Sequence, residues 1–172
     1  MTGIRRQKKK YSRPRKAFET ERISEENAVI KKYGLKNKRE IWKAEAQVAR
    51  LRNIAKSLIT ASDEEQESFI SKLVERGFLS SGSKIDNVLD MKREDYLSRR
   101  LQTVVHKKGF GRSPKHARQM VTHRFIRIKD RIVTVPSYIV DLKEEKLVTV
   151  KAMKAKAAPK PMMEEKQNES KK

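Results

Sequence analysis

The stretch that decides the fold reads RLQTVVHKKGFGRS at residues 100–113. Its Leu and two Val recur at helical spacing and predict the inner face of a helix running from about 92 to 107. Gly109 is expected to end that helix. Ser113 and Pro114 then supply an N-cap and a first helical residue, so a second short helix should follow the basic turn.

Downstream of these helices the periodicity changes to that of strands. Ile126 and Ile128 should point the same way, opposite Arg127, as a half-buried strand requires. A turn is expected at Lys129 and Asp130, where the absence of Gly disfavours the tight type I′ geometry. Further strands are expected at residues 132–135, 138–140 and 147–150.

Upstream, apolar spacing predicts a small helical unit over residues 20–80. A first helix should end at Gly34, because glycine readily adopts the left-handed conformation found after helix ends. A long helix with one apolar stripe follows, and a third helix should stop at Gly77. Cap-like pairs are expected at the starts of these two helices, Asn37 with Glu40 and Ser62 with Glu65.

The charge of the chain is strongly positive and unevenly distributed. The net charge is +21, from 43 Lys and Arg against 22 Asp and Glu. Residues 1–16 carry +8 and residues 99–131 carry +10, whereas residues 62–98 carry −4. Self-repulsion of this size opposes compaction unless a polyanion neutralises it. Nucleic acid is therefore the leading partner, and an anionic membrane is the second.

Composition argues against several other classes of protein. The chain has no Cys and only three His, so we expect no disulfide, no metal site and no cofactor. It has no apolar run near the roughly 20 residues that span a bilayer. The basic N-terminus lacks the apolar segment of a secretory signal. We therefore expect a cytoplasmic protein with no membrane partner.

The basic block at residues 99–131 has the chemistry of a phosphate-binding face. The second short helix should bury three apolar residues, which would leave Arg112 and Arg118 exposed. Arg and Lys side chains bind phosphate oxygens, and the amides at a helix start such as Ser113 also favour anions. A protein that recognises structured RNA by its shape and its phosphates needs these features.

The sequence also resembles a known family. The run at 100–113, followed by ARQMV at 117–121 and PSY at 136–138, is similar to the S-four RNA-binding module. KKKY at 8–11 and YGLKNKREIW at 33–42 resemble the archaeal and eukaryotic branch of the S-four family of small-subunit ribosomal proteins. The agreement extends over far more positions than a lone short motif.

The resemblance implies an α+β fold, in which a helical subdomain joins two short helices packed on a small antiparallel sheet, with disordered basic tails. It implies a non-enzymatic primary binder of the 5′ domain of small-subunit rRNA that nucleates assembly of the body. Neighbouring ribosomal proteins near the mRNA entry path would be partners, and no small-molecule substrate is expected. The expected divisions are a basic arm at 1–16, a helical subdomain at 17–90, the module at 91–150 and a disordered tail at 151–172.

The sequence departs from the family pattern at two places. Arg124 stands where many relatives have Gly, and Lys129 with Asp130 replaces an Asn-Gly turn. Both changes keep or add polarity, so RNA binding is still expected. The predicted RNA-binding residues are Arg5, Arg6, Lys8, Lys9, Lys10, Tyr11, Lys36, Lys38, Arg50, Lys56, Arg99, Arg100, Gln102, His106, Lys107, Lys108, Arg112, Ser113, Lys115, Arg118, Gln119, His123, Arg124 and Arg127.

Three other functions use the same features. The module could target an RNA-modifying enzyme such as a pseudouridine synthase, or act as a stand-alone RNA-binding protein. An enzyme would need a separate domain with a catalytic Asp in a pocket, and residues 17–98 are too short and too helical for one. A general chromatin-type binder fits the basic tails but does not account for the run at 100–138.

Overall fold

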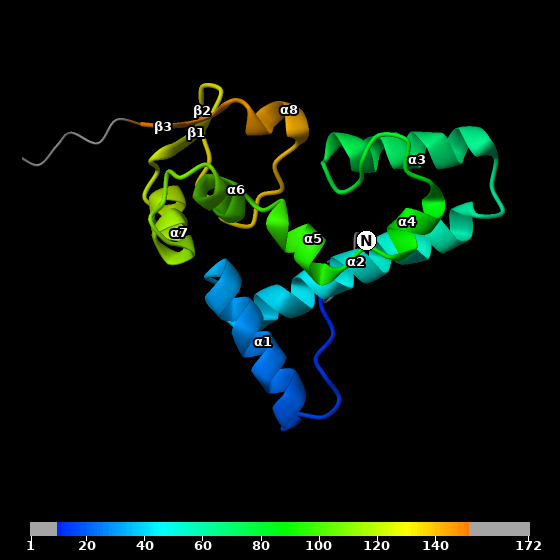
Figure 1. The fold of residues 1–172 in the computed structure, drawn as a ribbon, viewed down its shortest axis with the longest axis horizontal. Helices are drawn as coiled ribbons and strands as arrows, with labels where there is room; N and C mark the ends of the chain where they lie inside the picture. Colours follow the sequence, from blue (N-terminus) through cyan, green and yellow to red (C-terminus); the bar gives the residue numbers. More distant parts are fainter. Residues whose placement is uncertain (1–9, 152–172) are drawn as a thin grey trace, which may run out of the picture.

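The structure is a computed structural model that describes residues 10–151 (Figure 1). The first half of the expected arm and nearly all of the expected tail lie outside the described residues. The helices are α1 (Thr20–Tyr33), α2 (Lys38–Leu58), α3 (Asp63–Glu75), α4 (Ile85–Leu89), α5 (Arg93–Ser98), α6 (Leu101–Lys107), α7 (Pro114–Thr122) and α8 (Leu142–Glu145). The strands are β1 (Ile126–Ile128), β2 (Arg131–Ile132) and β3 (Val148–Val150).

Helix α2 is the central helix of the helical unit, and α1, α3, α4 and α5 pack along it (Figure 1). Its apolar stripe divides between two clusters because α1 and α5 pack on its first half, whereas α3 and α4 pack on its second half. Ile41 and Ala44 lie in the first cluster, and Ala55 lies in the second with Leu73 and Val88. The three helices predicted within residues 20–80 are confirmed, and Gly34 follows α1 in the left-handed conformation, with φ of 60°. Helices α4 and α5 extend the helical unit to Ser98.

The predicted capping boxes did not form. Neither Asn37 nor Ser62 makes a side-chain cap hydrogen bond, although both stand at the N-cap position of a helix. One Glu40 oxygen instead accepts from the backbone N–H of Lys36 at 3.3 Å. The helix starts were thus predicted correctly, but their capping bonds were not.

The C-terminal part of the fold packs α6 and α7 on one face of a three-stranded antiparallel sheet of order β2-β1-β3. We call residues 99–150 the C-terminal module, or simply the module. Its core holds Leu101 and Val105 from α6, Val121 from α7 and Ile126 from β1, all fully buried. The strands predicted around Ile126–Ile128 and residues 147–150 are confirmed, whereas of residues 132–135 only Ile132 lies in a strand, the two-residue β2.

The helix predicted from about 92 to 107 is two helices, α5 and α6. Arg100 is extended, with φ of −71° and ψ of 143°, and forms an isolated antiparallel bridge with Ile139. The backbone N–H of Leu101 donates to the carbonyl of Tyr138 at 2.7 Å. Because residues 136–140 take these backbone groups, the helix breaks there, and the predicted strand at 138–140 is reduced to this bridge.

The β1–β2 turn behaves as its residues predict. Ile128 pairs with Arg131, so Lys129 and Asp130 form a two-residue connection. Lys129 alone is left-handed there, with φ of 54°, whereas a type I′ turn needs positive φ at both residues. Within residues 10–151, no helix is long and apolar enough to cross a membrane.

Candidate nucleic-acid interface

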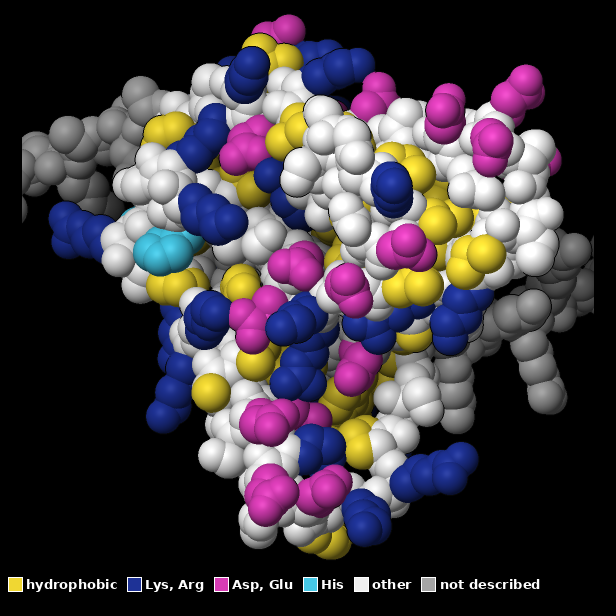
Figure 2. Space-filling model, turned by 45° about the vertical axis from the view of Figure 1, so that its right-hand side comes forward, with side chains coloured by type: hydrophobic (Ala, Val, Ile, Leu, Met, Phe, Trp, Pro, Cys, Tyr) yellow, Lys and Arg dark blue, Asp and Glu magenta, His cyan; other side chains and the backbone are white. Residues whose placement is uncertain are grey.

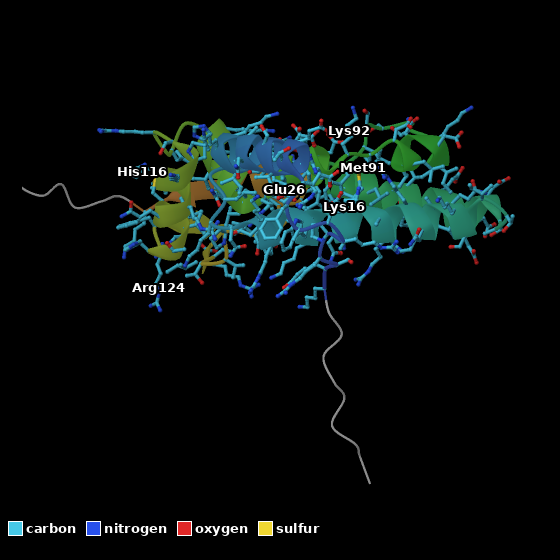
Figure 3. The ribbon with its side chains drawn as sticks, turned by 90° about the horizontal axis from the view of Figure 1, so that it is seen from below. Lys16, Glu26, Met91, Lys92, His116 and Arg124 are labelled. Carbon is cyan, nitrogen blue, oxygen red and sulfur yellow. The ribbon has the colours of Figure 1, made fainter. Side chains whose placement is uncertain are left out.

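Cationic and polar side chains cover the outer face of α7 and the turn before it. Helix α7 buries one face in the module core, so its other positions point to solvent. The predicted residues Lys107, Arg112, Lys115, Gln119, His123 and Arg124 are all exposed. Arg124 projects away from the body of the protein, as Figure 3 shows. The left-handed backbone at Arg124, with φ of 66°, gives this arginine its position directly after α7.

The start of α7 is closed rather than open. The Ser113 hydroxyl accepts from the backbone N–H of His116 at 3.2 Å, as its N-cap role predicts. Pro114 has no N–H, and the backbone N–H of Lys115 lies beneath Gly34 at the end of α1. Anion binding at this end therefore depends on the side chains of Arg112 and Lys115 more than on the helix amides.

Gly34, Pro114 and Lys115 define the contact between α1 and α7, which we call the α1–α7 seam. A Cβ added at Gly34 would lie 2.7 Å from the Cβ of Pro114 and 2.9 Å from the backbone nitrogen of Lys115. Only glycine fits this close approach, and its positive φ suits it as well. The seam places Lys115 beside Gly34, two positions before Lys36 in the chain, and both lysines are exposed.

Several of the predicted RNA-binding residues make internal contacts, and four of them lie where α6 meets the rest of the fold. Arg99 donates to Glu145 at 2.7 Å and to the carbonyl of Val140 at 2.8 Å, while Lys108 binds the carbonyl of Glu145. Arg100 is 5% exposed and Gln102 is 1% exposed, so neither reaches the surface. These four side chains hold the fold together in the described structure.

Arg118 is half-buried, contrary to the expectation that it is exposed. Its guanidinium lies 2.9 Å from one oxygen of Glu40 and donates to the other oxygen at 3.2 Å. The same Glu40 carboxylate accepts from Arg100 at 2.6 Å. Burial alone would raise the pKa of Glu40, but the hydrogen bond from Arg118 and the charge of Arg100 outweigh burial and lower that pKa.

Several other predicted residues are also described. Lys10, Lys36, Arg50 and Lys56 are exposed. Lys38 pairs with the buried Glu26 at 3.2 Å, and Nδ1 of His106 lies 3.1 Å from the carbonyl oxygen of Gly111. Arg127 is partly buried, and its Nε atom has no hydrogen-bond partner. Arg5, Arg6, Lys8 and Lys9 lie outside the described residues.

Two exposed cations on the first two turns of α2 are not among the predicted RNA-binding residues. Arg39 and Lys43 are exposed, and their spacing of four residues places them on the same helix face. Both positions lie off the apolar stripe of α2, which is the signal that could have found them. Together with Lys36 they give the helical unit a basic end close to the module.

The described part of the basic arm lies against the helical unit. The rings of Tyr11 and Trp42 have centroids 6.1 Å apart, and Ser12 lines a groove with Arg50 on α2. Arg22 donates to the carbonyl of Lys16 at 2.8 Å. The basic tails were expected to be disordered, whereas residues 10–16 contact the helical unit through the ring of Tyr11 and the carbonyl of Lys16.

The surface charge differs between α3 and the module. Acidic side chains gather in the first turn of α3, where Asp63, Glu64 and Glu65 are all exposed. Figure 2 shows acidic side chains projecting along the upper right edge, with Lys and Arg side chains on both sides of the histidine on the left. This division favours contact of an anionic partner with the module rather than with α3.

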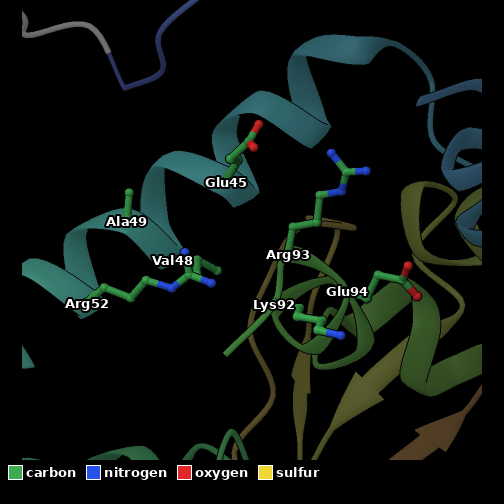
Figure 4. A pocket seen from close by; sticks show the side chains of 7 residues that line it. All are labelled: Glu45, Val48, Ala49, Arg52, Lys92, Arg93 and Glu94. Carbon is green, nitrogen blue, oxygen red and sulfur yellow. The ribbon is translucent and has the colours of Figure 1, made fainter. Parts of the chain in front are cut away.

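A groove of about 510 Å³ lies between α2 and the start of α5 (Figure 4). Its lining carries both signs of charge, with Glu45 and Glu94 beside Arg52, Lys92 and Arg93. The guanidinium of Arg52 donates a hydrogen bond to the carbonyl of Met91 at 2.6 Å. Mixed charge does not select an anion, and no cluster of metal-ligating side chains occurs anywhere in residues 10–151.

Comparison with known proteins identifies relatives of this chain. Residues 99–146 match the S4 domain family. A small ribosomal subunit protein uS4 from Methanothermobacter thermautotrophicus is 47% identical over 145 residues, which cover 82% of this chain and 85% of the relative. A uS4 protein from Korarchaeum cryptofilum is 42% identical over 148 residues, which cover 84% and 89%. These matches are long enough to include both the helical unit and the module.

Proposed function

The chain belongs to the family of small ribosomal subunit protein uS4, of the archaeal type, and from this premise we propose that it is a structural rRNA-binding protein of the small subunit. The role is one of binding and architecture, without a catalytic step. The observation that carries it is the exposed basic surface of α7 inside the matched S4 domain. Side chains there can neutralise phosphates without giving up bonds within the protein.

The proposed contact surface extends across the α1–α7 seam. On the module side it comprises Lys107, Arg112, Lys115, Gln119, His123 and Arg124, and on the helical side Lys36, Arg39 and Lys43. Lysines and arginines arranged on two packed elements fit the phosphates of a folded RNA junction better than a single strand. The acidic first turn of α3 would face away from the RNA.

We further propose that the RNA is the 5′ domain of small-subunit rRNA, and that the bound protein lies near the mRNA entry path beside other ribosomal proteins. The support for these details is the resemblance of residues 5–150 to the S-four family. Binding across a helix junction would hold two RNA arms in a fixed relation, which is how an early-binding protein nucleates assembly.

The test compares two RNAs and two matched variants. We expect the wild-type protein to bind a 5′-domain transcript more tightly than a central-domain transcript of the same rRNA. Affinity should fall steeply with salt, by roughly 0.7–0.9 in log–log slope for each phosphate contact. Equal affinity for both RNAs would contradict the proposal.

Two double variants locate the contact surface. Arg112→Ala with Lys115→Ala should lower the affinity for the 5′ domain and reduce the salt slope by about 1 for each lost contact. The control is Lys72→Ala with Lys84→Ala, which removes the same charge from exposed positions on and beyond α3. If both pairs weaken binding equally, net charge rather than this surface governs the interaction.

A further inference from the structure

We propose that four residues at the α1–α7 seam form a positioning centre that holds the two basic surfaces in one fixed relation for RNA. We call Glu40, Arg100, Gln102 and Arg118 the seam cluster. This inference rests on the proposed function, because it concerns how both halves of the protein bind the same RNA. It assigns to Arg100, Gln102 and Arg118 a role other than direct contact.

The cluster joins elements of different cores. Glu40 lies in the first turn of α2, whose neighbour Ile41 belongs to the apolar cluster of the helical unit. Arg100 and Gln102 flank Leu101 of the module core. The two cores share no residue, so this polar cluster bridges the boundary between them.

The Glu40 carboxylate is shared by two arginines of the module. Arg100 binds it at 2.6 Å and Arg118 at 2.9 Å, with side chains that are 6% and 24% exposed. Charge-assisted bonds to a fixed guanidinium constrain direction as well as distance. The Nε atom of Arg100 is buried without a partner, so Glu40 carries most of the compensation for that buried cation.

Gln102 binds the seam from the inside. Its side-chain Nε2 lies 3.0 Å from each of the carbonyl oxygens of Tyr33, Gly34 and Pro114. Its Oε1 accepts from Arg118 at 3.2 Å. One buried amide thus links the last turn of α1 and the first residue of α7 to the cluster.

Fixing the two halves matters because RNA is bound by both of them. When two surfaces are held rigidly at the right spacing, the second contact forms at a high effective concentration. If the seam loosens, each surface still binds phosphate, but the second contact gains less from the first. Both the affinity and the number of phosphates neutralised together should then fall.

The variant Glu40→Gln distinguishes the effect of the seam cluster on RNA affinity from the effect of net charge. The substitution makes the protein more positive, so electrostatics alone would raise its affinity for RNA. Loss of the seam cluster predicts the opposite, a loss of about tenfold in affinity for the 5′-domain transcript and a smaller salt slope. Glu45→Gln is the matched control, because Glu45 is exposed on the same helix and removes the same charge away from the seam.

Binding is measured across a salt series after circular dichroism and urea titration have established that each variant is folded. A folded Glu40→Gln protein with wild-type or higher affinity and an unchanged slope overturns the proposal. Equal losses in Glu40→Gln and Glu45→Gln overturn it as well. If Glu40→Gln does not fold, Glu40→Asp carries the test, since it keeps the charge and shortens the reach. Wild-type affinity and slope in folded Glu40→Asp then overturn the proposal.

The two proposals fail in different measurements. Lack of preference for the 5′ domain in the wild-type protein contradicts the proposed function, whatever the variants do. Wild-type selectivity with an unaffected Glu40→Gln protein contradicts only the positioning centre.

Discussion

Two neighbouring regions of the chain, one ending the helical unit and the other beginning the module, carry opposite net charge. Residues 62–98 carry −4 and residues 99–131 carry +10. The acids of α3 project into solvent, whereas two arginines of the module turn inward to the helical unit at Glu40. A polyanion is therefore attracted to one end and repelled from the other, so long-range charge orients the protein before any contact forms.

The largest effect on stability is expected from a substitution in the module core. Leu101 is fully buried in the module core, and Leu101→Ala should lower the free energy of unfolding by about 2–5 kcal/mol. Because the seam cluster joins the halves, urea unfolding followed by far-UV signal and by Trp42 fluorescence should show one coincident transition. Trp42 lies in the helical unit and reports on that half alone. Separate transitions would show that the helical unit and the module unfold as independent domains.

The next effect is a pH dependence carried by Glu40. Its pKa is lowered in the folded protein, so the carboxylate adds stability above its unfolded pKa and loses it as pH falls through the folded pKa. The difference in unfolding free energy between wild type and Glu40→Gln should be largest near neutral pH and shrink at strongly acidic pH. Urea titrations of both proteins across this range measure it. A difference that does not change with pH would show that the charge of Glu40 does not stabilise the seam.

A smaller effect concerns the arm where it meets the helical unit. Tyr11→Ala should lower the free energy of unfolding by about 0.5–1.5 kcal/mol, because it removes the ring packed near Trp42. Tyr11→Phe keeps the ring and should leave stability nearly unchanged. If Tyr11→Ala unfolds at the wild-type urea concentration, the arm gains nothing from the helical unit in solution.

The smallest effect tests the charge difference between α3 and the module. Glu64→Gln with Glu67→Gln neutralises two exposed acids of α3 far from the proposed contact surface. Affinity for RNA should rise by about twofold to fivefold at low salt, and the gain should disappear when salt shortens the Debye length. A gain that persists at high salt would mean that α3 lies in direct contact with the RNA.

Local signals in the sequence identified most of the fold. Ser113 with Pro114 marked the start of α7, and Gly34 and Gly77 marked the positions after α1 and α3 where the backbone becomes left-handed. These features depend on residues a few positions apart. The break between α5 and α6 was not predicted, because the bridge of Arg100 to Ile139 that accompanies it is invisible to helical periodicity.

The charge pattern of the sequence predicts a candidate surface, but it does not predict the surroundings of each residue on that surface. Arg112 and Arg118 lie on or beside one helix and look equivalent in the sequence, yet the first is exposed and the second binds Glu40. The difference comes from a carboxylate 78 positions away from Arg118 in the chain. Charge patterning reports where cations are dense, and only tertiary contacts show which of them already have a partner.

The seam cluster also has a consequence for the order of folding. Its ion pairs join residues separated by 60 and 78 positions, whereas each helix needs only contacts within one or two turns. Closing such long loops costs chain entropy before any contact compensates for it, so these contacts slow folding relative to local ones. During synthesis α1 and α2 leave the ribosome well before Arg118, and the seam cannot close until then. A newly made chain therefore has a helical first half before the two halves acquire their fixed relation.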